Sequence, residues 1–204
     1  MDNTPLRVPG KNALSEYVVS FDAVGLRDLD RVGGKNASIG EMIGALTQLG
    51  VRVPRGFATT ADAFREFLRQ GGLEGRINAE LDALDSADVT ALAACGARIR
   101  RWILDTPLPP PLQQALLGSW KAMDAGRNIA VAVRSSATAE DLPSASFAGQ
   151  QETFLNILGL DNLLLAIRHV FALASPHPGN RARRDSGGGA TRSPRTRRAR
   201  IRKA

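Results

Sequence analysis

An arginine followed by small polar residues is the feature of this chain best suited to bind an anion. Large and small side chains alternate over residues 129–134, which predicts a buried strand that ends at Arg134. A guanidinium offers a planar fork of donors that matches phosphate oxygens, and small residues let backbone N–H groups approach the same anion. The segment therefore predicts a phosphate-binding turn, and an ion pair of Arg134 with Glu140, Asp141 or Glu152 is the competing interpretation.

A second candidate lies about a hundred residues earlier. Gly33 and Gly34 precede Lys35 at the start of a helical pattern. The first N–H groups of a helix, its dipole and a lysine ammonium can all converge on one anion. Taken alone, this tripeptide is better explained as a plain turn, but combined with Arg134 it predicts a second contact to phosphate.

The apolar spacing predicts the elements that position these residues. Several elements are bounded by Gly, Pro or a capping residue, and the apolar residues follow helical or strand spacing. Strands are expected at 17–21, 129–134 and 153–157, with Thr153, Leu155 and Ile157 on one face, and helices at about 35–49, from a Thr59 cap to 68, and at 73–84, 92–103, 112–123 and 161–172. The predicted fold class is α+β, helix-rich with a small mixed sheet.

Charge is distributed very unevenly along the 204 residues. The formal charge is +7, yet ten of the 27 Lys and Arg residues and only one of the 20 acidic residues lie in 175–204. That segment is too poor in apolar residues to repay its ordering entropy, so we expect it to be disordered, as we expect residues 1–16 to be a flexible leader. A frameshifted G+C-rich reading frame explains the Arg-rich composition better than a basic arm for nucleic acid or membrane does.

Cysteine usage and hydropathy favour a cytoplasmic protein. Cys95 is the single cysteine and is expected to be a small buried hydrophobe. The N-terminus lacks the pattern of a signal peptide, and no apolar stretch is long enough to span a bilayer. Trp102 and Trp120 lie on apolar helix stripes, which predicts core positions for both.

Three motifs resemble the N-terminal nucleotide-binding region of the phosphoenolpyruvate-utilising dikinases. They are DRVGGKNASIGEM at 30–42, VPRGFATTADAF at 53–64 and VRSSATAEDLPSASFAGQQETFLNI at 133–157. The family includes phosphoenolpyruvate synthases (pyruvate, water dikinases), pyruvate, phosphate dikinases and rifampicin phosphotransferases. The resemblance extends over residues 17–174 and implies the N-terminal part of an ATP-grasp-like domain.

The resemblance also implies a ligand and its contacts. ATP would be bound by Lys35, Arg134, Gly149 and Thr153, and the Mg²⁺ ligands would lie in a downstream part of the domain. The intact parent would convert pyruvate, ATP and water to phosphoenolpyruvate, AMP and phosphate through a phosphohistidine, a gluconeogenic reaction. Neither His169 nor His177 matches the phosphorylated histidine, so no catalytic residue is expected in this chain, which would be inactive alone. The alternatives are a fragment of an antibiotic phosphotransferase and a small nucleic-acid-binding protein.

Overall fold

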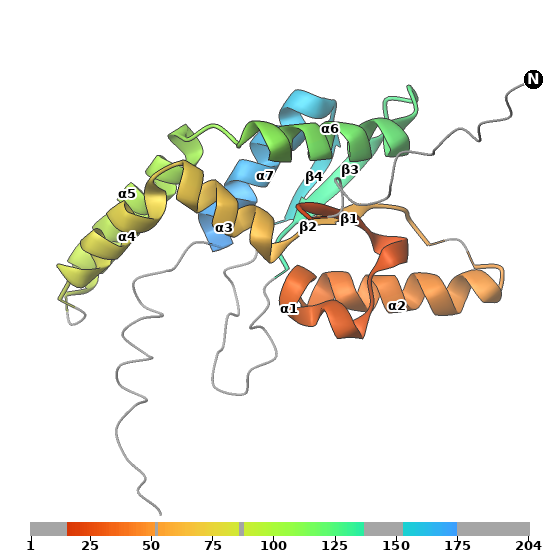
Figure 1. Ribbon diagram of the computed structural model, residues 1–204, viewed down its shortest axis with the longest axis horizontal. Helices are drawn as coiled ribbons and strands as arrows, with labels where there is room; N and C mark the ends of the chain where they lie inside the picture. Colours follow the sequence, from red (N-terminus) through yellow and green to blue (C-terminus); the bar gives the residue numbers. More distant parts are fainter. Residues whose placement is uncertain (1–15, 52, 86–87, 137–152, 175–204) are drawn as a thin grey trace, which may run out of the picture.

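The computed structural model describes residues 16–51, 53–85, 88–136 and 153–174 (Figure 1). Residues 1–15 of the predicted leader, the basic tail and Gly149 lie outside these residues. In chain order the elements are β1 (Val18–Ser20), the 3-10 turns η1 (Phe21–Ala23) and η2 (Leu26–Asp28), α1 (Leu29–Val32), α2 (Gly34–Gln48), β2 (Phe57–Thr59), α3 (Ala61–Gln70), α4 (Leu73–Asp82), α5 (Val89–Asp105), α6 (Pro110–Asp124), β3 (Ala130–Arg134), β4 (Thr153–Leu158) and α7 (Leu160–Ala174).

The predicted α+β, helix-rich class is confirmed, but the single mixed sheet is wrong. The described strands form two separate two-stranded sheets, β1 with β2 and β3 with β4, and both pairs are antiparallel. A two-stranded sheet is marginal by itself and needs a packed face. In Figure 1 the helices α6 and α7 lie beside β3 and β4, while α1 and α2 lie on the other side of the β1–β2 pair.

The described residues form two hydrophobic clusters that β1 joins. The larger cluster gathers buried side chains from α3, α4, α5, α6 and α7. The smaller one consists of Val19, Val24, Val32, Ala37 and Ala58, around β1, β2 and the start of α2. Because successive side chains of a strand point to opposite faces, Val18 enters the large cluster and its neighbour Val19 enters the small one.

The predicted core positions of the cysteine and the tryptophans are confirmed. Cys95 is fully buried, and burial raises the pKa of its thiol, which keeps it a neutral hydrophobe. Trp120 is buried in the large cluster. Trp102 packs against the same cluster with the Arg76 guanidinium 4.2 Å from its ring centroid.

One predicted helix start was displaced by a residue. Thr60, not Thr59, is the N-cap of α3, and its hydroxyl accepts from the Ala63 N–H at 3.2 Å. The same hydroxyl donates to the Glu16 carbonyl at 2.6 Å, and Thr60 is the buried member of the pair. Sequence spacing could not separate two adjacent threonines, because the difference between them includes a contact with Glu16, 44 positions earlier in the chain.

Helix α2 packs against η1, η2 and α1 through a glycine. A Cβ atom added at Gly40 would lie 2.7 Å from the Val24 carbonyl carbon and closer still to its oxygen, whereas one added at Gly44 meets nothing within 4 Å. Backbone carbonyls cannot move aside as a flexible side chain can. Close approach at Gly40 therefore fixes how α2 lies on the small cluster.

Within the described residues, no helix combines the length and apolar character needed to cross a membrane.

This pair of glycines provides a matched test of the packing. Gly40→Ala is expected to lower the free energy of unfolding by about 1–3 kcal/mol through overpacking, or roughly 2–4 °C in Tm per kcal/mol. Gly44→Ala, four residues later in the same helix, should raise stability by about 0.4–1 kcal/mol because nothing opposes the gain in helix propensity. Thermal unfolding followed by circular dichroism measures both, and equal effects of the two substitutions would refute the close packing at Gly40.

Candidate nucleotide site

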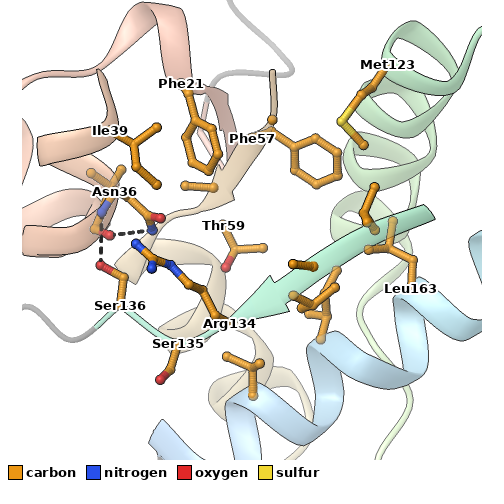
Figure 2. Close-up of a pocket in the computed structure, with 18 of the residues that line it drawn as sticks. Phe21, Asn36, Ile39, Phe57, Thr59, Met123, Arg134, Ser135, Ser136 and Leu163 are labelled. Carbon is orange, nitrogen blue, oxygen red and sulfur yellow. Dashed lines mark hydrogen bonds between the residues drawn. The ribbon is translucent and has the colours of Figure 1, made fainter. Parts of the chain in front are cut away.

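A cavity of about 1050 Å³ lies between the two hydrophobic clusters (Figure 2). One side is formed by η1, α2 and β2, and the other by α6, β3 and α7. Phe21, Ile39, Phe57, Met123 and Leu163 supply apolar surface. The volume is slightly above the range of about 300–1,000 Å³ that is usual for small-molecule sites.

The charged residues that line the cavity all carry the same sign. Among the described residues of its wall there are four arginines and no aspartate or glutamate; the arginines are Arg31, Arg55, Arg127 and Arg134. Arg127 also donates to the carbonyls of Asp124 and Met123, at 3.2 and 2.8 Å, and so closes the end of α6. A wall with several guanidinium groups and no carboxylate favours an anionic ligand that also has an apolar part.

The strand that carries Arg134 differs from its prediction in burial. Val131 and Val133 do alternate with exposed residues, but they are half-buried, so β3 is not the buried strand that the sequence predicted. The half-buried face packs against the large cluster. The opposite face carries Arg134, which is exposed and lines the cavity.

Arg134 and Thr153 are directly opposed in the antiparallel pair of β3 and β4. Opposed residues lie on the same face of a sheet, so the two predicted site residues are brought together at one end of the hairpin. Thr153 is exposed and is not among the residues that line the cavity. It stands beside Arg134 rather than within the cavity wall.

A β-bulge breaks the predicted alternation of β4. Val131 pairs with Ile157 and Val133 with Phe154, so β4 contains one more residue than β3 over this interval. Asn156 lies within this interval and takes the left-handed conformation, with φ of 57°. The predicted common face of Thr153, Leu155 and Ile157 is therefore wrong, because Ile157 turns toward the core while Leu155 is 65% exposed.

The glycines before Lys35 bring the first turn of α2 against the end of β3. Gly33 is the N-cap with φ of 79° and ψ of 159°, a region that glycine alone occupies readily. A Cβ atom there would lie 2.7 Å from the carbonyl carbon of Ser136 and closer to its hydroxyl and carbonyl oxygens. The glycine is needed here for a close approach between backbones as well as for a turn.

A hydrogen bond joins these two segments. The Asn36 backbone N–H donates to Ser136 Oγ at 3.3 Å, between residues 100 positions apart. Figure 2 shows Arg134 pointing from the end of β3 toward Asn36, beside this bond. The Asn36 amide donates to the Val32 carbonyl at 2.8 Å, which holds that side chain at the site. Sequence reasoning missed Asn36, although its place in the first turn after the glycines was the available signal.

Lys35, a predicted site residue, and Ser135, which follows Arg134, differ in their relation to the cavity. Lys35 is half-buried in the first turn of α2 and is not among the residues of the cavity wall. Ser135 lines the cavity, and its hydroxyl is buried with no hydrogen-bond partner in the described part of the chain. A buried hydroxyl without a partner usually has a ligand, a water or a rearrangement to satisfy it. Across the described ranges, no group of three His, Cys, Asp or Glu residues is arranged to hold a metal ion.

Residues 29–177 match the family of the pyruvate phosphate dikinase AMP/ATP-binding domain, and the chain belongs to this family. It is 60% identical over 158 residues to phosphoenolpyruvate synthase of Pseudomonas aeruginosa, covering 77% of this chain and 20% of the relative. Phosphoenolpyruvate synthase of Escherichia coli is 56% identical over 162 residues, covering 79% and 20%. That of Aquifex aeolicus is 44% identical over 158 residues, covering 76% and 18%. The chain thus spans about a fifth of the length of these relatives and aligns with their N-terminal region.

The contact at Gly33 can be tested against a second glycine with a similar φ. Gly126 has φ of 75°, and a Cβ atom there meets nothing within 4 Å. Both Gly33→Ala and Gly126→Ala incur the cost of a positive φ, roughly 1–3 kcal/mol, and the cost is at the upper end for Gly33 because of its ψ of 159°. Gly33→Ala must in addition separate α2 from Ser136, so it should lose about 1–3 kcal/mol more. Chemical denaturation of the two variants gives the difference, and equal losses would contradict the close approach.

Proposed function

We propose that this chain is the ATP-binding N-terminal part of a phosphoenolpyruvate synthase. The carrying observation is the cavity whose described wall holds four arginines and no aspartate or glutamate, at the end where Arg134 points toward the first turn of α2. The identity of 56–60% to phosphoenolpyruvate synthases supports pyruvate as the acceptor of the whole protein, rather than an antibiotic. Nothing in the described residues favours a nucleic-acid-binding role.

In this proposal the phosphates of ATP lie at the end of the cavity that is lined by Arg134, Ser136 and Asn36. Arg134 holds phosphate oxygens through its planar fork of donors. The N–H groups of α2 that precede Asn36, whose own N–H donates to Ser136, complete the anion site together with Lys35. Thr153 adds a hydroxyl from the opposed strand. Gly149 would add a close backbone contact; it lies outside the described residues. The apolar surface around Phe21, Phe57 and Met123 is suited to the uncharged part of the nucleotide.

The rest of the reaction is assigned to parts of the protein beyond this segment. Mg²⁺, when bound, neutralises charge on the phosphates, and we propose that its ligands and the phosphorylated histidine lie downstream in the intact ATP-grasp-like enzyme. The intact protein would use ATP and water to convert pyruvate to phosphoenolpyruvate, AMP and phosphate in the cytoplasm. The contribution of this chain is to bind and orient the nucleotide, and we propose residues 17–174 as the segment that does so.

Substitutions at the two cationic residues test the assignment. Arg134→Ala and Lys35→Ala should each weaken ATP binding about ten- to more than a hundredfold, since each removes a charge-assisted bond worth roughly 1.5–3 kcal/mol. Arg134→Lys should recover little, because a point charge cannot reproduce the bidentate fork. Calorimetric titration with ATP measures the dissociation constants.

The matched control is Arg101→Ala. Arg101 is exposed on α5 and is not part of the cavity wall, so its loss should change ATP affinity less than about twofold, equivalent to under roughly 0.5 kcal/mol. Arg127 is unsuitable as a control because it lines the cavity. ATP binding by Arg134→Ala equal to that of the unsubstituted chain would show that the cavity is not the nucleotide site.

A further inference from the structure

Ser136 follows the end of β3, which carries Arg134, and contacts the first turn of α2. Helix α2 packs mainly on η1, η2 and α1, and Ala37 in its first turns belongs to the small cluster. Strand β3 packs through Val131 and Val133 against the large cluster. The strand that ends at Arg134 therefore packs on the large cluster, and the first turns of α2 pack on the small cluster. The cavity lies between the two clusters.

The contact at Ser136 fixes the separation of these two segments. Its hydroxyl accepts the N–H of Asn36 at 3.3 Å, and Gly33 allows its backbone to lie against the start of the helix. Only one residue lies between Ser136 and Arg134 along the chain. A shift of Ser136 away from α2 would therefore carry Arg134 away from the helix N-terminus, and misplacement of about 1 Å is enough to weaken a charge-assisted contact substantially.

We propose that Ser136 is a positioning residue that sets Arg134 against the first turn of α2, so that both segments bind the same phosphate group. This inference rests on the proposed function and adds to it a residue that does not itself have to touch the nucleotide. A hydroxyl suits the role because it is a short acceptor for the N–H of a helix end. The bond is longer than the usual 2.9–3.0 Å and lies in a half-buried place, so its loss should affect geometry more than stability.

The role predicts coupling between Ser136 and Arg134. Ser136→Ala removes the acceptor and should weaken ATP binding about three- to tenfold, the effect of one neutral hydrogen bond. Ser136→Thr keeps the hydroxyl and should stay within about twofold of the unsubstituted chain. In an Arg134→Ala background, Ser136→Ala should change ATP affinity by less than about twofold, because the group that it positions is absent.

The experiment titrates ATP and adenosine into the 204-residue chain and its variants, with ¹⁵N NMR to follow weak binding. Adenosine affinity should not change with Ser136→Ala, since no phosphate is present. Ser38→Ala is the matched control, because Ser38 is exposed on the same helix and lies outside the cavity wall. Ser136→Cys, a nearly isosteric variant with a weak acceptor, replaces Ser136→Ala if the latter does not fold.

The outcomes separate this inference from the proposed function. Failure of the unsubstituted chain to bind ATP would overturn the proposed function and the positioning role with it. ATP binding by the unsubstituted chain that is unaffected by Ser136→Ala and Ser136→Cys would overturn the positioning role alone. Equal losses from Ser136→Ala with and without Arg134 would also overturn it, since additivity means that Ser136 acts independently of the arginine.

Discussion

The approach of the first turn of α2 to the end of β3 is the constraint on which the candidate site depends. It requires a glycine at position 33, because any side chain there would meet the backbone of Ser136, and it is closed by the bond from Asn36. Without that approach, a helix N-terminus and an arginine would be two weak anion sites on separate cores. Held together, they can share one phosphate group, and the affinity of such a site exceeds that of either part.

The cavity follows from the division of the chain into two clusters. Because Val18 and Val19 of β1 enter different cores, the strand joins the clusters without filling the space between them. That space is lined by apolar side chains from both cores and by arginines from several segments. A nucleotide has the same combination of an uncharged body and a charged end, which is why the electrostatics of the wall and the family membership lead to the same proposal.

Local patterns predicted much of this arrangement, and long-range contacts accounted for what they missed. The strand ending at Arg134 and the helix after the paired glycines follow from periodicity and from glycine chemistry, both of which are local. The bulge at Asn156 was not predictable, since an asparagine with positive φ leaves no periodic signal. The contact of Ser136 with Asn36 spans 100 positions, and no spacing rule relates residues so far apart.

The central claim is that the first turn of α2 and the end of β3 bind the phosphates of one nucleotide, and NMR titration of the ¹⁵N-labelled chain tests it most directly. ATP is predicted to shift the backbone amides of Lys35 and Asn36 together with the side-chain Nε of Arg134, at one common dissociation constant. Adenosine is predicted to leave these three signals in place. Shifts caused equally by ATP and adenosine, or ATP-induced shifts confined to other parts of the chain, would contradict the claim.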